Sequence, residues 1–482
     1  MRAGRRDFLK LGAAGILGCS ARSWAADIPT VADLAGDVDI LGQALKLHPG
    51  LYRYNRPPEA DAALEELRRR FPRAANSSDR YLLLSRFLSR IRCGHTYANF
   101  FNQKKAVAAD LFDRPTRLPF HFAWIDRAMI VTADPSGQFP AGTKIAGLNG
   151  RDPRMLLREL LPLVRADGHN DGKRISLLEV QGTEKIETFD IFQGLVAPPR
   201  AGTHQITAEL PNGATKKLQI APIALAERRQ QMRSAAPQAD GALWSWNVRK
   251  DGIAVLTMPT WALYDSKWDW NAWLSDRLEG LGHARGLIID LRDNEGGEDC
   301  GNPILARLIR KSYTPPRTEQ RIRFAKTPAA IDKYLDTWDD SFRNLGVGAR
   351  PLADGFLLRP GAKEMLSIEP AATNLKVPVV VLISPVNSSA TFQFAQNFRQ
   401  IGRGRLVGET TGGNRRGING SCFFFVRLPA SGLEFDLPLV GEFPLSPQPD
   451  AGLVPDVVVK RSRADVLSGR DSAFERAIQL LS

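Results

Sequence analysis

Apolar residues in the N-terminal part of the chain recur with helical spacing. The spacing predicts one helix over residues 55–71 and a second over residues 78–91. Asn55 and Ser78 are candidate N-caps, because a side-chain oxygen at that position can accept a free backbone N–H of the first turn. Residues 26–105 are therefore expected to form a small helical unit.

The pattern changes to short strand-like runs between residues 106 and 221. An apolar run over residues 128–132 is followed by a glycine-containing strand pattern over residues 142–150. Asp152 and Pro153 then predict the start of a helix, since aspartate accepts first-turn N–H groups and proline fits the first helical position. A compact module of strands and helices is expected in this region.

Strands alternate with helices from residue 245 to residue 482. The predicted strands span residues 253–257, 286–291 and 377–383, and the predicted helices span residues 268–281, 302–309 and 392–401. Apolar strands that alternate with helices indicate a sheet covered on both faces. Two segments leave alternatives open: residues 222–240 are a helix or a linker, and residues 312–365 are a substrate lid or a solvated excursion.

The first residues have the pattern of an export signal. Arg5 and Arg6 precede an apolar run and then small residues, and Ala26 follows a small-x-small cleavage pattern. The apolar run is too short to span a bilayer, which needs about 20 apolar residues. We interpret residues 1–25 as a twin-arginine signal peptide and expect a periplasmic protein without a transmembrane span. The alternative is a lipid anchor on Cys19, whose preceding residues loosely resemble a lipidation box.

The composition is that of an ordinary globular protein, with 43% hydrophobic and 24% charged residues. Six histidines and four cysteines without a His-Glu-x-x-His or Cys-x-x-Cys motif give no signal for a zinc site, so we expect neither a metal nor a cofactor. The net charge is +13, but Lys and Arg are scattered among acids, which favours a solvated basic surface over a nucleic-acid interface. Beyond the predicted leader only Cys93, Cys300 and Cys422 remain, so at most one intramolecular disulfide can form.

Two turns that follow predicted strands carry the candidate chemistry. Ser388 and Ser389 lie between the last predicted strand and its helix, where a hydroxyl meets the positive end of the helix dipole. Such a serine is either a nucleophile or an ordinary N-cap. Gly296 and Gly297 follow an apolar strand, and one of their N–H groups can join that of Ala390 to form an oxyanion hole.

Four segments together resemble the tail-specific, or C-terminal processing, serine peptidase family. They are residues 287–297, with the Asp-Leu-Arg-x-Asn-x-Gly-Gly signature, residues 388–390, residues 406–413 and residues 452–456. The resemblance implies an α/β multidomain protein with a crotonase-like protease core over residues 245–482. It also implies an N-terminal helical segment and an inserted PDZ-like domain over residues 106–221.

The resemblance assigns the nucleophile to Ser389, the serine immediately before alanine, and Ser388 is the neighbour most easily confused with it. Many relatives use a lysine as the base, but the corresponding position here is Asn414. The tricorn-like branch instead takes a histidine from the N-terminal helical segment, and a Gly-His-Thr sequence matches that branch at His95. The resemblance therefore implies that His95 accepts the Ser389 proton and returns it to the leaving amine.

An acid that orients the His95 ring is expected nearby, because it stabilises the imidazolium. Asp450, just before the closing Gly-Leu-Val-Pro-Asp segment, and Glu409, in the Gly-Glu-Thr-Thr segment, are the two candidates. Arg415 and Arg416 either pair with a substrate carboxylate at the rim of the cleft or belong to a solvated loop.

Taken together, these residues predict a serine peptidase that cleaves exported proteins or peptides through an acyl-enzyme on Ser389. The PDZ-like domain and the two arginines are expected to let it read a substrate at its C-terminus. Two alternatives stay open. One is a ligand- or peptide-binding relative of the same fold that has lost catalysis, and the other is an esterase that uses the same site.

Overall fold

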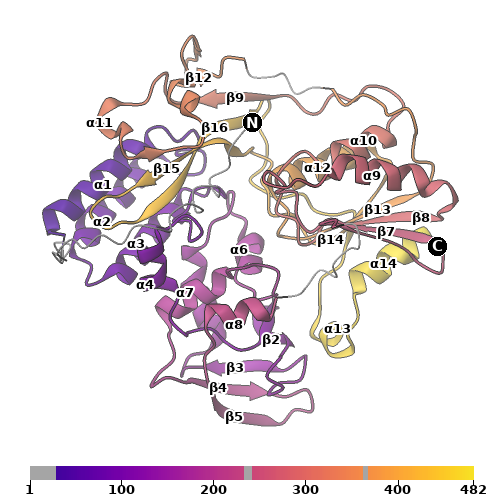
Figure 1. The fold of residues 1–482 in the computed structure, drawn as a ribbon, viewed down its shortest axis with the longest axis horizontal. Coiled ribbons are helices and arrows are strands. Elements are labelled where there is room, and N and C mark those ends of the chain that lie inside the picture. The colour runs from indigo at the N-terminus through magenta and orange to yellow at the C-terminus, as the bar shows by residue number, and fades with distance from the viewer. Residues whose placement is uncertain (1–28, 233–240, 362–366) are drawn as a thin grey trace, which may run out of the picture.

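The computed structural model describes residues 29–232, 241–361 and 367–482. The predicted signal peptide, with Cys19, lies outside the described residues. Figure 1 shows the N-terminal helices on one side of the molecule and a helix-covered sheet on the other, with a five-stranded sheet below them. Within the described ranges, no helix combines the length and the apolar character needed to cross a membrane.

The N-terminal part is a helical unit. Its elements are α1 (Val31–Leu45), α2 (Pro57–Arg70), η2 (Phe71–Arg73), α3 (Ser77–Arg90) and α4 (Lys105–Phe112). The two predicted helices are confirmed, but both predicted caps are wrong. Asn76 caps α3 by accepting the N–H of Asp79, so Ser78 lies inside the first turn. Asn55 lies one residue too early to cap α2, and its amide donates to the carbonyl of Arg90 instead.

The next part is the expected module of strands and helices. Its elements are β1 (His121–Ile125), β2 (Ala128–Ala133), β3 (Lys144–Leu148), α5 (Pro153–Leu160), η3 (Leu161–Leu163), α6 (Asp171–Leu177), α7 (Thr188–Val196), β4 (His204–Glu209) and β5 (Thr215–Ile220). The strands form one antiparallel sheet in chain order. Asp152 caps α5 by accepting the N–H of Arg154, as predicted. In the connector, α8 (Leu225–Gln230) is helical, and residues 233–240 lie outside the described part of the chain.

The C-terminal half contains the predicted layered sheet. Its strands are β6 (Ser245–Val248), β7 (Ile253–Thr257), β8 (Gly286–Asp290), β13 (Val379–Ile383), β14 (Gly404–Gly408) and β17 (Val457–Val458). The order is β17-β14-β13-β8-β7-β6, and only β6 is antiparallel to its neighbour. The helices are α9 (Trp270–Glu279), η4 (Gly280–His283), α10 (Asn302–Leu308), α12 (Ser389–Ile401), α13 (Arg463–Ser468) and α14 (Ser472–Leu481).

Both faces of this sheet are covered, as the apolar strands predict. Leu287 and Ile289 of β8 belong to a hydrophobic cluster with residues of α9, α10 and α12. Ile288, which points to the opposite face, packs in a second cluster with Ala477 of α14. Figure 1 shows α14 on the side of the sheet opposite to α9, α10 and α12.

A second six-stranded sheet contains strands from the segment that begins at residue 312, and this sheet packs against the N-terminal helices (Figure 1). It consists of β9 (Thr318–Ile322), β10 (Leu335–Asp336), β11 (Arg350–Pro351), β12 (Leu357–Leu358), β15 (Asn419–Arg427) and β16 (Glu434–Pro444), with α11 (Ala329–Asp332) and η5 (Asp340–Asn344) between the short strands. The order is β10-β15-β16-β9-β12-β11. Phe424 and Leu437 share a hydrophobic cluster with Leu41 and Leu84 of the helical unit. The described part of this segment, residues 312–361, therefore contributes strands to a folded sheet and is not simply a solvated excursion.

Candidate active site

The turn between β13 and α12 presents Ser389 as a strained first helical residue. Its φ is +51°, in the left-handed region that residues other than glycine rarely adopt. The side chain is partly exposed, and its hydroxyl has no hydrogen-bond partner among the described residues. A strained backbone of this kind costs on the order of 1 kcal/mol and persists only where its surroundings fix it, as at a nucleophile on a strand-to-helix turn.

The neighbouring Ser388 is buried, with 4% of its surface exposed. It occupies the N-cap position of α12, but its side chain makes no capping hydrogen bond. Its hydroxyl accepts a hydrogen bond from the Lys173 ammonium at 2.7 Å and donates to the Glu295 carbonyl at 3.0 Å. The Ser388 side chain therefore anchors the turn to two other segments instead of capping the helix.

Lys173 reaches this turn from α6, and its side chain is only 1% exposed. Its three N–H groups have three acceptors, namely Oε1 of Glu295 at 2.7 Å, the Val386 carbonyl at 3.0 Å and Oγ of Ser388 at 2.7 Å. An ammonium has three donors and no lone pair, so the fully bonded group is the charged form. Burial lowers the pKa of Lys173, and the ion pair with Glu295 opposes that effect.

Glu295 connects this lysine to the segment that carries His95. Its carboxylate forms a bidentate pair with Arg165, at 2.7 and 3.0 Å. Arg165 also donates to the carbonyl of Gly94 at 2.9 Å. Burial would raise the pKa of Glu295, but the two cations outweigh it and hold that pKa far below its usual range. A continuous set of polar contacts therefore runs from Gly94, beside the histidine, to Ser388, beside the candidate nucleophile.

The glycine loop after β8 lies directly against the candidate nucleophile. An ideal Cβ at Gly296 would come within 2.8 Å of Ser389 Cβ and 3.3 Å of the Ala390 nitrogen. At Gly297 the φ is +141°, and an added Cβ would meet the backbone of Trp261 at 2.1 Å. Neither position can carry a side chain, because the loop must approach other backbone this closely.

Two of the three predicted oxyanion donors have an unpaired N–H. Gly296 donates its N–H to Asn294 Oδ1 at 2.9 Å, so that group is already committed. The N–H groups of Gly297 and Ala390 have no acceptor among the described residues. Ala390 lies in the first turn of α12, where N–H groups lack intrahelical acceptors. Of the three predicted donors, the N–H groups of Gly297 and Ala390 are therefore the two that can stabilise an oxyanion.

Two buried asparagines fix the glycine loop to the turn. Asn387 Nδ2 donates to the carbonyls of Leu291 and Asn294, at 2.5 and 2.9 Å. The hydroxyl of Thr391 donates to Asn294 Oδ1 at 2.7 Å. These bonds pair buried backbone groups that neither the sheet nor the helix uses, and they set the loop geometry before any substrate binds.

His95 follows α3 and lies beside the same charged groups. Its side chain is partly buried, and its Nδ1 is buried without a hydrogen-bond partner. Burial lowers the pKa of His95, and the largest opposing influence comes from Asp167. Arg165, Glu295 and Lys173 also act on the pKa of His95, which places its ring in the charge cluster that anchors the serine turn. The lowered pKa favours the neutral imidazole, the form that can accept a proton.

Asp167 is the carboxylate that the structure brings to His95, and it is 3% exposed. A carboxylate oxygen of Asp167, a ring nitrogen of His95 and Sγ of Cys93 all lie within 4.8 Å of one another. Oδ1 of Asp167 accepts the N–H of Gly94 at 2.8 Å, which fixes the carboxylate against the histidine segment. Sequence patterns did not reveal Asp167, because it lies in a loop between η3 and α6.

The two acids expected to orient His95 have other neighbours. Asp450 accepts hydrogen bonds from Nδ1 of His169 at 2.5 Å and from Nδ2 of Asn414 at 2.6 Å. Glu409 follows β14 and lines a cavity at the ends of the parallel strands, where burial raises its pKa. No hydrogen bond joins either acid to Nδ1 of His95. Asp167, in the loop that follows η3, lies beside the His95 ring instead.

Arg415 and Arg416 are exposed on the loop that begins with Asn414. Arg415 donates to Oε1 of Gln448 at 2.9 Å, and Nε of Arg416 donates to the Gln448 carbonyl at 3.4 Å. Asn414 itself is buried, and its amide is bonded to Asp450. The hydrogen bond from Asn414 to Asp450 therefore fixes the start of the loop, while the guanidinium groups of Arg415 and Arg416 remain accessible to solvent.

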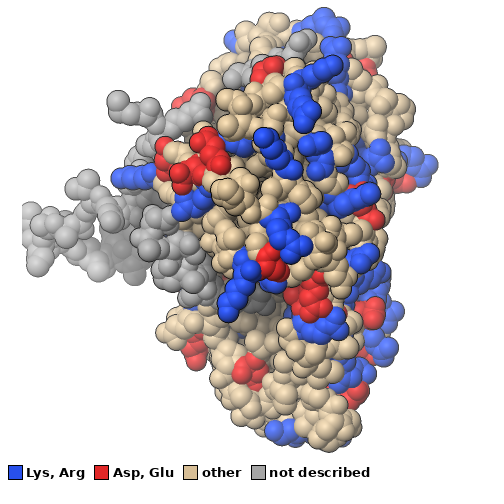
Figure 2. Space-filling view, turned by 90° about the vertical axis from the view of Figure 1, so that its right-hand side faces the viewer, with Lys and Arg blue, Asp and Glu red and all other residues tan. Residues whose placement is uncertain are grey.

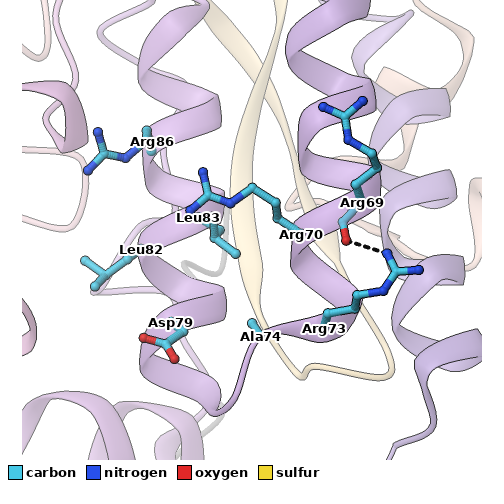
Figure 3. A pocket seen from close by; sticks show the side chains of 8 residues that line it. All are labelled: Arg69, Arg70, Arg73, Ala74, Asp79, Leu82, Leu83 and Arg86. Carbon is cyan, nitrogen blue, oxygen red and sulfur yellow. Dashed lines mark hydrogen bonds between the residues drawn. The ribbon is translucent and has the colours of Figure 1, made fainter.

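Two cavities lie away from the candidate nucleophile and base. One, of about 480 Å³, lies between α2 and α3, and Figure 3 shows the four arginines among its lining residues, which are Arg69, Arg70, Arg73 and Arg86. The other, of about 530 Å³, lies at the carboxyl ends of β8 and β13. Neither cavity is lined by Ser389 or His95. On the face shown in Figure 2, Lys and Arg are spread among Asp and Glu and form no single stripe.

Comparison with known proteins finds a matching family model and similar folds. Residues 252–421 match the model of peptidase family S41. The fold is similar to that of mature CPAF complexed with lactacystin, with a TM-score of 0.60 and 14% identity over 94% of this chain and 98% of that chain. A second structure of mature CPAF gives a TM-score of 0.57 and 15% identity over 94% and 96% of the two chains. No curated protein matches the chain.

Proposed function

We propose that Ser389 is the nucleophile and His95 the general base of this protein, a serine peptidase in which residues 252–421 match peptidase family S41. The observation that carries this proposal is the contact between the strained turn at Ser389 and the glycine loop. The loop contributes the unpaired N–H of Gly297, and the turn contributes that of Ala390. A nucleophile next to unpaired backbone donors is the arrangement that acyl transfer requires. Family and geometry therefore support the same serine.

In the proposed reaction, Oγ of Ser389 attacks the carbonyl carbon of the scissile peptide bond while a ring nitrogen of His95 accepts the hydroxyl proton. The carbonyl oxygen becomes an oxyanion, which receives hydrogen bonds from the N–H groups of Gly297 and Ala390. His95 then gives its proton to the leaving amine, and an acyl-enzyme remains. A water molecule attacks the ester carbon and passes a proton to His95, which returns it to Ser389 Oγ as the carboxylic acid leaves.

We assign the orienting acid to Asp167 rather than to Asp450 or Glu409. Its carboxylate lies within 4.8 Å of a ring nitrogen of His95, and its charge raises the pKa of His95 against the effect of burial. A carboxylate with this influence stabilises the imidazolium that forms during the reaction. Hydrogen bonds between catalytic groups are often long without substrate and tighten in the complex, so the open contact at Nδ1 fits this role.

Lys173 is a positioning residue in this proposal. Its ammonium ties Oγ of Ser388 and the carbonyl of Val386 to the carboxylate of Glu295, so it fixes the turn that carries the nucleophile. It is a poor candidate for the base, because all three of its donors are used and an ammonium has no lone pair. A lysine therefore contributes to this site from α6, in a different part of the chain from the lysine base of many relatives.

The finer features of the fold and the substrate are also part of the proposal. The layered sheet would be a crotonase-like core, and residues 106–221 would be a PDZ-like domain that positions a substrate tail. The order of the motifs and the five-stranded sheet of the module support this division. Arg415 and Arg416, both exposed, would pair with the C-terminal carboxylate of the substrate. The twin-arginine signal supports a periplasmic enzyme that acts on exported proteins or peptides.

The test is fluorophosphonate labelling of the purified protein, with intact-mass measurement of wild type, Ser389→Ala, His95→Ala and Ser388→Ala. Wild type is expected to gain one adduct, Ser389→Ala none, and His95→Ala to label about 100-fold more slowly. Ser388→Ala controls for the neighbouring serine and is expected to keep the adduct. Label on Ser389→Ala would overturn the choice of nucleophile, and a folded wild type without label would favour a binding protein that has lost catalysis.

A further inference from the structure

We propose that Cys93, His95 and Asp167 form a zinc-binding site in which the bound ion occupies the base and inhibits the enzyme. The inhibition rests on the proposed function, whereas the binding site does not. A sulfur, a ring nitrogen and a carboxylate oxygen from these residues lie within 4.8 Å of one another. In the described ranges, no other group of three His, Cys, Asp or Glu side chains meets this condition.

The spacing is close to that of a zinc site. Zinc binds cysteine sulfur at about 2.3 Å and histidine nitrogen or carboxylate oxygen at about 2.0–2.2 Å, so tetrahedral ligand atoms are about 3.5 Å apart. Closing the present spacing requires a movement of about 1 Å shared among three side chains. Three protein ligands leave the fourth position to water, as in zinc sites that exchange ligands.

An independent observation points to a ligand at the same place. Nδ1 of His95 is buried and has no hydrogen-bond partner, although buried polar atoms are normally paired. Cys93 is a free cysteine and is 1% exposed, so its sulfur is not used in a disulfide. A coordinated ion would use both atoms at once, and it can enter from the side of the partly exposed His95 ring.

The outer contacts orient the other two ligands. Asn419 Nδ2 donates to Sγ of Cys93 at 3.5 Å, and Arg53 Nη2 donates to Oδ1 of Asn419 at 3.0 Å. Oδ1 of Asp167 accepts the N–H of Gly94, which leaves the second carboxylate oxygen for the ion. Hydrogen bonds to ligand atoms of this kind are usual around metal sites, where they fix ligand orientation.

The binding step balances in charge and in protons. The thiol of Cys93 releases its proton to solvent, and the thiolate, the Asp167 carboxylate and the neutral imidazole each donate an electron pair to Zn²⁺. Zinc adds two positive charges and the thiol proton removes one, so the three side chains with the ion change from a net charge of −1, on Asp167, to zero, and no uncompensated charge remains in the buried region. No oxidant or reductant is needed. With an electron pair of the imidazole used by zinc, His95 cannot accept the proton of the nucleophile.

The binding site is tested with Co²⁺ as the probe, because a cobalt-bound thiolate gives a near-ultraviolet charge-transfer band. Wild type and Cys422→Ser, which removes another buried free cysteine, are expected to give the band with one equivalent of Co²⁺, and Zn²⁺ is expected to abolish it. Cys93→Ser and Cys93→Ala are expected to lose the band while they keep the circular dichroism of wild type. The absence of a band in wild type, or the same band in a folded Cys93 variant, would overturn the site.

The inhibition is tested by fluorophosphonate labelling with and without Zn²⁺, with each variant compared with its own rate in a chelator. Zinc is expected to slow wild type and Cys422→Ser at least about 10-fold and to leave Cys93→Ser within about twofold. Loss of a group that only orients a metal ligand typically costs about 10- to 100-fold in affinity, and loss of the ligand itself is expected to cost at least as much. A cobalt band without any effect of zinc on labelling would overturn the inhibition. A cobalt band in a protein that never labels would support the zinc site and count against the proposed function instead.

Discussion

Two histidine–aspartate pairs near the serine turn, both in the described part of the chain, differ in hydrogen-bond geometry, the property that is usually used to recognise a catalytic pair. Nδ1 of His169 donates to the Asp450 carboxylate at 2.5 Å, and the His169 side chain is 55% exposed. His95 lies beside Asp167 within 4.8 Å, and its Nδ1 is buried without a partner. Hydrogen-bond geometry alone would choose His169 as the base.

The surroundings of the two rings favour the opposite choice. His95 adjoins Gly94, which is connected through Arg165, Glu295 and the Lys173 ammonium to the serine turn. The His169 pair is instead bonded to Asn414, at the start of an exposed loop. A histidine–carboxylate pair is therefore informative about catalysis only together with its connection to a nucleophile.

The largest expected effect separates the two histidines directly. His95→Gln is expected to lower kcat/KM for a peptide substrate about 100- to 10,000-fold, because the general base is lost. His169→Gln is the matched substitution on the other pair and is expected to stay within about threefold of wild type, since a solvent-exposed contact contributes little. Steady-state kinetics on both variants give the comparison, and the reverse ranking would move the base to His169.

The two acids are expected to separate in the same way, with a smaller effect. Asp167→Asn is expected to lower kcat about 100-fold, because the amide cannot stabilise the imidazolium. Asp450→Asn is expected to change KM more than kcat, because Asp450 supports the Asn414 loop. A loss of kcat in Asp450→Asn equal to that in Asp167→Asn would restore Asp450 as the orienting acid.

A third variant tests whether the polar network connects the base segment to the turn. Lys173→Met removes the donor from the Ser388 hydroxyl and the Val386 carbonyl and leaves Arg165 as the cation on Glu295, so kcat is expected to fall about 10-fold with KM nearly unchanged. The Glu295 side chain is 39% exposed, so loss of the lysine is expected to cost about 1–2 kcal/mol of stability, less than the loss of one member of a fully buried pair. Thermal unfolding and kcat are measured together, with Lys173→Arg as the conservative variant.

Partial recovery of kcat in Lys173→Arg would support a positioning role, because arginine keeps the charge and several donors. If Lys173→Met is destabilised but its kcat is unchanged, the positioning role is wrong and Lys173 contributes to stability alone. In either case the comparison of kcat with stability distinguishes the role of Lys173 from those of the reacting groups, Ser389 and His95.

The sequence predicts the serine turn well because the signal there is local. Strand, turn and helix follow one another within residues 379–401, and apolar periodicity describes contacts of this range. The glycine loop is also local, although the sequence could not tell which of Gly296 and Gly297 keeps its N–H unpaired. That choice depends on the side chain of Asn294, which folds back onto Gly296.

Asp167 and Lys173 could not be predicted in the same way. Both lie in or next to α6, which is too short for a clear periodic pattern, and both reach the site only through tertiary folding. The second sheet escaped prediction for a related reason, since β10, β11 and β12 have two residues each and cannot show alternation. The pairing of β10 with β15 and of β12 with β9 depends on contacts that are distant in sequence.

The smallest expected effect concerns the loop that the second pair supports. Replacing both Arg415 and Arg416 by alanine is expected to raise KM about two- to fivefold for a peptide with a free C-terminus, because an exposed ion pair contributes about 0.5–1 kcal/mol. The same peptide with an amidated C-terminus is expected to show no change. Arg69→Ala with Arg73→Ala, in the cavity of Figure 3, is the matched control for loss of two exposed charges. Equal effects on the two peptides, or an equal effect of the control, would show that general electrostatics and not recognition of the substrate terminus is responsible.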